Sequence, residues 1–362
     1  MSNASAPVLI MAGGTGGHIF PGLAVADALR ACEIPVLWLG ATGGMETKLV
    51  PARGIALETV PVSGLRGKKM LARLTAPWML LRALLASLRV LRENQPRSVL
   101  SMGGYVAGPG GLAAWLLRKP LLVHEQNRIP GFTNRVLVKF ARRVLAGFSD
   151  AFSPHTHAEW TGNPVRAAIA ALPSPAHRFA PRESERPSLL ILGGSLGARA
   201  LNLRVPEALA LVPEAQRPRV LHQCGAAHVE ATRAAYARAQ VEARVEPFIE
   251  DMARVYADAD LAICRAGALT LAELAAAGLG AILVPFPYAV DDHQTRNAEG
   301  FVEVGAAELV QERDFDTAKF AHRLQRLLGD RERLLAMAQS ARKLAKPDAA
   351  ATIAQRCLEV AA

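Results

Sequence analysis

The residues best suited to chemistry stand near the N-terminus, in the stretch Ile10-Met-Ala-Gly-Gly-Thr-Gly-Gly-His-Ile-Phe-Pro-Gly22. An apolar run breaks into a turn with four glycines, and His18 follows directly. Glycines let backbone N–H groups come close to a ligand, and a helix after the turn presents its positive end to an anion. An imidazole titrates near neutral pH and can take a proton from an attacking hydroxyl group. A histidine that only bonds its own loop or contacts phosphate is the equal alternative.

Three further glycine-containing turns follow strand-like runs, at Gly193–Gly197, Met102–Gly111 and Arg265–Glu273. The first turn fits neither GxGxxG nor the GxxxxGK pattern of a Walker loop. One such turn can simply close a strand–helix unit tightly. Four turns in two halves of a chain favour ligands that carry diphosphate, because the carboxyl ends of parallel strands converge on one crevice.

Glu273 is expected in the first turn of a helix that starts near Leu269 and Thr270. Its carboxylate can accept hydrogen bonds from a ribose diol while the helix N–H groups hold a diphosphate. An acid in a first turn also complements the helix dipole, which alone is the commoner role.

The sequence predicts no metal and no other cofactor. Asp258-Ala-Asp260 matches the DxD pattern that holds a divalent metal on nucleotide sugars, but it directly precedes a buried run and is typical of a helix-to-strand corner. His124-Glu125 is not part of an HExxH motif. The four cysteines are scattered without a CxxC pair, which fits a reducing cytoplasm. A departing diphosphate must then be stabilised by helix ends and turn N–H groups.

Residues 65–92 form a basic amphipathic segment, with seven Lys or Arg and no acid before Glu93. Arg82 and Arg89 interrupt its apolar arc, so the roughly 20 clean residues of a membrane span are absent. Most of its leucine stripe is expected to be core, as in an ordinary helix of an α/β domain. The excess of apolar side chains beside lysines favours an anionic membrane surface. The residues expected to contact it are Leu65, Lys68, Lys69, Leu71, Arg73 and Trp78.

Short apolar runs alternate with helical patterns along the whole chain, which predicts an α/β fold with doubly wound parallel sheets. The expected strands are Val8–Met11, Pro35–Leu39, Val99–Met102, Leu121–His124, Ser188–Leu192, Arg219–His222, Leu261–Cys264 and Ala281–Val284. The pattern of the first turn recurs at Gly193–Gly197, which indicates two Rossmann-like domains. We expect an N-terminal domain over 1–166, a proline-rich linker at its end (167–187), and a second domain over 167–344. The sequence leaves open which domain a C-terminal helix within 345–362 joins.

The composition limits the classes of binding partner that are expected. The 362 residues carry a net charge of +10, which favours anionic partners such as phosphorylated small molecules, an acidic membrane or nucleic acid. Aromatic residues make up only 5%, and no nucleic-acid motif is present, so nucleic acid is disfavoured. The N-terminus lacks a basic region and is interpreted as leading into a first strand, not as a signal peptide.

Together these segments resemble the MurG family, the UDP-N-acetylglucosamine:lipid I N-acetylglucosaminyltransferases of peptidoglycan synthesis. The resemblance runs through nearly the whole chain in the family's order. Its segments are GGTGGHIFPG (13–22), GLRGK (64–68), GGYVAGPGGLAA (103–114), HEQNRIPGFTNRVL (124–137), GNPVR (162–166), GGSLGARALN (193–202), CRAGALTLAELAAAG (264–278) and DDHQTRNA (291–298). The sequence departs from the family at Leu196, usually glutamine, and at Ala266, often serine, which puts the fine contacts to the donor in doubt.

The resemblance implies a GT-B-type fold, with two Rossmann-like domains facing across a cleft and UDP-N-acetylglucosamine held mainly by the second. N-acetylglucosamine then moves with inversion to the C4 hydroxyl group of the N-acetylmuramyl unit of lipid I, giving lipid II, with His18 as candidate base. The implied donor-binding residues are Thr15, Gly16, Gly17, Asn127, Arg166, Ser195, Ile249, Ala268, Leu269, Thr270, Leu271, Ala272, Glu273 and Gln294. The implied acceptor-diphosphate residues are Gly13, Gly14, Gly103, Gly104 and Tyr105.

The same resemblance implies a peripheral protein at the cytoplasmic face of the bacterial inner membrane, with roles in cell wall biogenesis, cell shape and cell division. Partnership with other cell-wall and division proteins stays open. The rival functions are a UDP-N-acetylglucosamine 2-epimerase, a transferase with another lipid acceptor, a nucleic-acid-binding protein and an inactive scaffold. An epimerase has no need of the basic amphipathic segment, and the presence of His18, Glu273 and Gln294 weighs against a scaffold.

Overall fold

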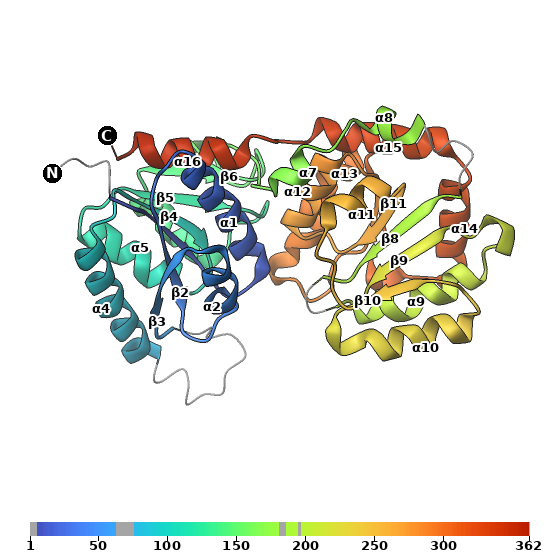
Figure 1. The fold of residues 1–362 in the computed structure, drawn as a ribbon, viewed down its shortest axis with the longest axis horizontal. Helices are drawn as coiled ribbons and strands as arrows, with labels where there is room; N and C mark the ends of the chain where they lie inside the picture. The colour runs from blue at the N-terminus through green and yellow to red at the C-terminus, as the bar shows by residue number, and fades with distance from the viewer. Residues whose placement is uncertain (1–5, 63–75, 181–185, 195–196, 362) are drawn as a thin grey trace. The chain divides into compact units, whose positions relative to one another are not determined.

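The structure is a computed structural model of the chain, and it describes residues 6–62, 76–180, 186–194 and 197–361. Residues 65, 68, 69, 71 and 73, predicted to contact the membrane, lie outside this part, as do Ser195 and Leu196. The chain divides into two compact units, residues 1–165 with 347–362 and residues 166–346 (Figure 1). Each unit is built on one parallel β-sheet flanked by helices.

The sheet of the first unit has seven strands in the order β3-β2-β1-β4-β5-β6-β7. The strands are β1 (Val8–Ala12), β2 (Val36–Ala41), β3 (Ala56–Val60), β4 (Ser98–Gly103), β5 (Leu121–Glu125), β6 (Arg143–Ala146) and β7 (Glu159–Trp160). The helices are α1 (Gly16–Ala31), α2 (Glu46–Leu49), α4 (Ala76–Asn94), α5 (Ala107–Leu116), α6 (Phe132–Leu137) and α16 (Ala349–Glu359).

The central strand β1 is buried on both faces, which explains its unbroken apolar sequence. Successive side chains of a strand point to opposite faces of the sheet. Ile10 accordingly packs in a core with Leu23 of α1 and Ile353 of α16. Met11 packs in the core on the other face, with Leu91 of α4. These two cores fix the end of β1, from which the first glycine turn leaves.

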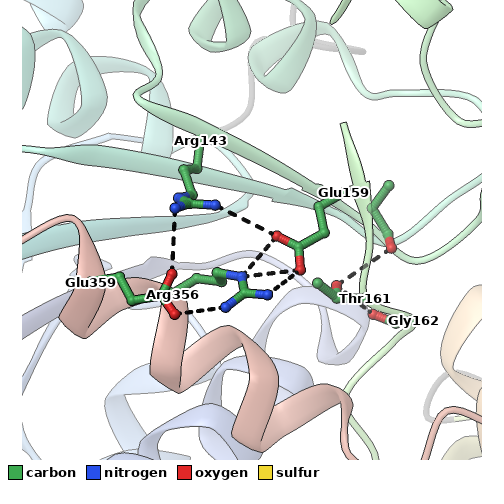
Figure 2. A network of polar contacts seen from close by, with 7 residues as sticks. Arg143, Glu159, Thr161, Gly162, Arg356 and Glu359 are labelled. Carbon is green, nitrogen blue, oxygen red and sulfur yellow. Dashed lines mark hydrogen bonds and ion pairs between the residues drawn. The ribbon is translucent and has the colours of Figure 1, made fainter. Parts of the chain in front are cut away.

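The C-terminal helix α16 belongs to the first unit, where it packs against α1. Arg356 of α16 donates to both carboxylate oxygens of Glu159 on β7, with N–O distances of 2.7–3.0 Å (Figure 2). These bonds hold the pKa of Glu159 below its usual value. The network continues to Arg143 of β6, whose guanidinium group lies 3.4 Å from the carboxylate of Glu359. Beyond Glu159 the chain continues to Gly162, whose carbonyl group enters the site described below.

The sheet of the second unit has six strands in the order β10-β9-β8-β11-β12-β13. They are β8 (Ser188–Leu192), β9 (Arg219–Gln223), β10 (Arg244–Glu246), β11 (Leu261–Cys264), β12 (Ala281–Leu283) and β13 (Ala307–Leu309). The helices are α7 (Ala167–Ala170), α8 (Pro175–Phe179), α9 (Arg199–Ala210), α10 (Val229–Ala239), α11 (Met252–Asp258), α12 (Ala268–Ala277), α13 (His293–Glu303), α14 (Thr317–Leu328) and α15 (Arg331–Lys343).

All eight strands predicted from apolar runs are confirmed within one or two residues at their ends. The runs missed in the sequence, β3, β6, β7, β10 and β13, lie toward the sheet edges, where one face or an end meets solvent and polar residues are tolerated. The predicted linker is wrong for its first part. Residues 167–180 form α7 and α8, and the buried Arg178 donates to the carbonyl oxygens of Tyr256, Ala277 and Gly278.

Candidate functional site

The first glycine turn connects β1 to α1, as predicted. Gly14 has φ of +95°, a left-handed value that favours glycine, and Thr15 adopts an extended conformation at the helix N-cap. The side chain of Glu46, fully buried, accepts from the N–H of Ala41 at 2.7 Å and, more weakly, from that of Gly14 at 3.4 Å. Glu46 therefore holds the underside of the turn, and the N–H of Gly14 is turned toward a carboxyl group.

The turn after β4 contacts the first glycine turn directly. Gly103 and Gly104 have φ of +96° and +87°. A Cβ atom on Gly104 would collide with the backbone of Gly13, and one on Gly103 would lie 3.1 Å from the imidazole ring of His18. Tyr105 approaches Gly14 and is half exposed. The residues predicted for the acceptor diphosphate thus lie close together, and the candidate base His18 lies beside them.

His18 is the third residue of α1 and is partly buried. Its Nδ1 atom lies 3.0 Å from Oε1 of Gln126, and Nε2 of Gln126 lies 3.0 Å from Nδ1 of His124. Nε2 of His124 in turn lies 2.9 Å from the carbonyl oxygen of Gly162. Burial lowers the pKa of His124 to about 4. His18, the candidate base, is therefore connected through Gln126 to the buried His124 by a series of hydrogen-bonding groups.

The loop after β5 is organised by Glu125, which is almost fully buried. Its Oε1 atom accepts from the backbone and side-chain nitrogens of Asn127, and its Oε2 atom accepts from the N–H of Gly131 and from Nδ2 of Asn134 at 2.9 Å. Asn127, a predicted sugar-binding residue, is thereby held at this loop. Sequence reasoning assigned no role to Glu46, Glu125, Gln126 or Asn134. The signal available for two of them, Glu125 and Gln126, was a run of polar residues at the end of a buried strand.

In the second unit, Arg166 and Glu273 are brought together as the predicted donor residues require. Arg166 donates to Oε1 of Glu273 at 2.7 Å, and the buried hydroxyl group of Tyr256 donates to Oε2 at 3.0 Å. Burial and the nearby Glu273 raise the pKa of Tyr256 well above its usual value, so the hydroxyl group keeps its proton. Both carboxylate oxygens of Glu273 are thus held in place, and each has a further lone pair that can accept a hydrogen bond from a ligand.

The position of Glu273 in its helix corrects one prediction. Gly267 is the N-cap, so α12 starts at Ala268 and Glu273 is its sixth residue. The helix has no acid in its first turn. A role as a first-turn acid on the helix dipole is therefore excluded, because that effect fades beyond the first turn. Residues 268–270 supply the first N–H groups of α12, which have no partner within the helix, whereas the N–H of Leu271 already donates to the carbonyl oxygen of Gly267 at 3.0 Å.

The remaining donor candidates lie at separate places in the second unit. Gln294 on α13 accepts from the N–H of Phe286 at 2.9 Å, and Arg265 donates to the carbonyl oxygens of the two residues before Phe286. The turn at Gly193 and Gly194 is fixed by Gln223, which exchanges hydrogen bonds with Gly194. Ile249 lines a pocket of about 360 Å³ that runs to the start of β8, away from this glycine turn.

Helix α4 shows an exposed apolar face. Trp78 is 65% exposed and Leu85 57%, and Leu81 is exposed as well. The prediction that most of the leucine stripe is core is therefore wrong. The buried side of α4 carries Ala83, Ser87, Val90 and Leu91, and α4 packs against α5, which is rich in glycine and alanine. No helix within the described ranges combines the length and apolar character needed to cross a membrane.

Across the part of the chain that the structure describes, no group of three or more His, Cys, Asp or Glu side chains is placed to hold a metal ion. Asp260 accepts from the N–H of Ser188 at 2.8 Å, and Asp258 lies at the end of α11. The pair thus stands at the predicted corner before β11.

Comparison with known proteins identifies the family. Residues 8–146 match the glycosyltransferase family 28 N-terminal domain, and residues 188–353 match the corresponding C-terminal domain. The chain is 56% identical to the UDP-N-acetylglucosamine–N-acetylmuramyl-(pentapeptide) pyrophosphoryl-undecaprenol N-acetylglucosamine transferase of Alkalilimnicola ehrlichii, over 98% of this chain and 99% of the relative. It is 57% identical to the equally named protein of Xylella fastidiosa, over 98% and 96%.

Among solved structures, the MurG of Acinetobacter baumannii is similar with a TM-score of 0.81 and 41% identity, covering 98% of this chain and 99% of that one. These matches, with the two parallel sheets, confirm the predicted GT-B-type fold class. The resemblance found in the glycine turns is confirmed as well. The chain belongs to glycosyltransferase family 28, among the UDP-N-acetylglucosamine-dependent transferases known as the MurG family.

Proposed function

We propose that the protein transfers N-acetylglucosamine from UDP-N-acetylglucosamine to the C4 hydroxyl group of the N-acetylmuramyl unit of lipid I, forming lipid II. The observation that carries this proposal is the 56% identity over 98% of the chain to a transferase whose name describes this reaction. The matched region covers 98% of the chain, so it spans both units.

The reaction is a single displacement. The C4 oxygen of the acceptor attacks C1 of N-acetylglucosamine and forms the new C–O bond, while the bond from C1 to the diphosphate oxygen breaks. UDP leaves with that electron pair, and the hydroxyl proton passes to the imidazole ring of His18. Attack from the face opposite the leaving group inverts the configuration at C1.

The donor site that we propose centres on Glu273. Because Arg166 and Tyr256 hold its two oxygens, the carboxylate is oriented before the ribose diol arrives. The N–H groups at the start of α12 suit the diphosphate, since helix N-termini favour anions. Gln294 and Asn127 are assigned to the sugar, while Ser195 and Ile249 keep the uridine and phosphate roles implied by the family.

The acceptor diphosphate is assigned to the two contacting turns of the first unit. Thr15, Gly16 and Gly17, implied above for the UDP-sugar, belong to the same turn. Their N–H groups at the start of α1 are more available to a phosphate than the N–H of Gly14, which is turned toward Glu46. Gly103 and Gly104 form the wall beside His18. This arrangement suits a lipid-linked diphosphate whose reacting sugar lies next to the imidazole ring.

Membrane binding is assigned to the exposed face of α4, and α5 exposes large apolar side chains as well. Trp78, Leu81 and Leu85 on α4 and Trp115 and Leu116 on α5 are large apolar side chains that are exposed. Basic residues flank them on α4, and apolar groups with flanking cations favour an anionic membrane surface. We infer a peripheral protein at the inner face of the bacterial inner membrane, where a lipid-linked acceptor is presented.

The experiment that tests the function supplies UDP-N-acetylglucosamine with and without a short-chain lipid I analogue. We expect a lipid-linked disaccharide only when both are present. Conversion of the donor to its 2-epimer without acceptor would instead support the epimerase alternative. Donor binding with no product on lipid I would point to a different acceptor.

A further inference from the structure

The polar chain behind His18 begins at an atom whose role is unambiguous. The carbonyl oxygen of Gly162 can only accept, so Nε2 of His124 must carry a hydrogen and donate across the 2.9 Å contact. His124 is fully buried and its pKa is lowered to about 4, so the ring is neutral at physiological pH. A neutral imidazole with its hydrogen on Nε2 has a bare Nδ1, and this atom can only accept.

The orientation of the Gln126 amide group follows. Its Nε2 atom faces two acceptors, Nδ1 of His124 at 3.0 Å and the backbone carbonyl oxygen of His124 at 3.1 Å. Both hydrogens of the amide are thus used, and the reversed amide would set an oxygen against two acceptors. The oxygen Oε1 must therefore face His18, where it lies 3.0 Å from Nδ1.

An amide oxygen can only accept, so Nδ1 of His18 must carry the hydrogen in this contact. We propose that Gln126 and His124 are positioning residues, which hold His18 as the tautomer protonated on Nδ1 and leave Nε2 as the atom that takes the proton of the acceptor hydroxyl group. This inference deepens the proposed function and rests on His18 being the base. The same amide oxygen continues to accept from Nδ1 after Nε2 is protonated, so the contact stabilises the imidazolium that forms.

The other titratable groups around His18 are few in the described part of the chain. Glu125 is occupied by the nitrogens of its own loop and of Asn134, and Glu46 faces the turn backbone. Tyr105 lies against Gly14. The charged residues that α16 carries toward the sheet are paired with Glu159 and with Arg143. Within this described set no charged side chain contacts Nδ1 of His18, whose partner is the neutral amide of Gln126.

Nuclear magnetic resonance of protein labelled with ¹⁵N-histidine reads the tautomer without any turnover. Long-range ¹H–¹⁵N spectra distinguish a protonated ring nitrogen from a bare one, and His18→Gln identifies the His18 signals. In the native protein at alkaline pH we expect His18 protonated on Nδ1 and His124 protonated on Nε2. A native His18 protonated mainly on Nε2 overturns the proposal, whether or not the enzyme is active.

Variants then test whether the tautomer matters. Gln126→Leu removes the acceptor, so we expect mixed His18 tautomers and a kcat lower by about 10- to 100-fold, with the KM for the donor nearly unchanged. Gln126→Glu keeps an oxygen toward Nδ1, and we expect it to recover part of kcat. Its carboxylate places a negative charge beside Nδ1 and so favours the imidazolium, which should move the acid limb of the rate profile to higher pH. The exposed Gln216→Leu in the other unit serves as the control.

A purely structural role for Gln126 predicts another pattern. The carboxylate of Gln126→Glu would face two acceptors of His124, so this variant would then be no more active than Gln126→Leu. That result, or an unchanged tautomer in Gln126→Leu, overturns the proposal. Failure of the proposed function looks different, because the native protein would then form no disaccharide on the lipid I analogue while the native tautomer remained as expected.

Discussion

The donor site offers a prediction whose size follows from its geometry. In Glu273→Gln the amide oxygen will face the donors of Arg166, which leaves an amide nitrogen in place of Oε2, beside Tyr256. The ribose diol then loses one hydrogen bond to a charged acceptor, worth about 1.5–3 kcal/mol. We expect the Kd for UDP to rise by about 10- to 150-fold. The exposed Glu242→Gln in the same unit is the matched control.

Isothermal titration with UDP and with 2′,3′-dideoxy-UDP separates this effect from a general loss of structure. The native protein should bind the dideoxy analogue more weakly than UDP, whereas Glu273→Gln should bind both with similar affinity. Stability should change little, because Arg166 is 38% exposed and such pairs contribute about 0–1 kcal/mol. The ribose assignment would be refuted if Glu273→Gln bound UDP as tightly as the native protein does. It would also be refuted if the losses of binding free energy from the substitution and from removal of the two ribose hydroxyl groups were additive.

Three further outcomes are expected. His18→Gln should lower kcat by about 10²–10⁴-fold with donor affinity nearly unchanged, and near-native turnover in rapid-quench assays would remove it as the base. Exchange of Trp78 and Leu85 for serine should release the protein from anionic vesicles in flotation assays, whereas Leu211→Ser, equally exposed in the other unit, should not. Burial lowers the pKa of His222 to about 3, below its usual 6.5. Between these values the unfolded chain binds a proton that the folded protein does not, so stability should fall as pH drops below about 6.5. A urea midpoint unchanged from pH 7 to pH 5 would contradict this.

The sheets were predictable because parallel strands are buried on both faces and read as unbroken apolar runs. Short edge strands carry no such signal. β10, Arg244–Glu246, begins and ends with a charged residue, and only its pairing with β9 makes it a strand. The glycine turns were predictable as well, since Gly14 and Gly103 adopt backbone conformations that favour glycine.

The burial of α4 could not be read from the sequence. Helical spacing reveals an apolar arc but not which side faces the protein. Here α4 packs against α5, which is rich in glycine and alanine, and the buried residues of α4 are Ala83, Ser87, Val90 and Leu91. The large side chains of Trp78 and Leu85 are left outside.

The residues that orient the site residues could not be predicted from the sequence either. Glu125 ends β5 and Gln126 follows it, both as ordinary polar residues. Their partners include Gly131, which is 6 positions from Glu125, and His18, which is 108 positions from Gln126. A hydrogen-bond chain of this kind exists only after β5, α1 and the segment of Gly162 have come together. The sequence can therefore point to His18 but not to what orients it.

The most direct test of the central claim is the linkage formed on a short-chain lipid I analogue. The α-linked UDP-N-acetylglucosamine is supplied with labelled sugar, in parallel tubes with and without EDTA, and the product is examined by nuclear magnetic resonance. A single displacement predicts a β-(1→4)-linked disaccharide on the lipid, formed equally in both tubes. An α-linked product, or labelled sugar that never reaches the lipid, would contradict it.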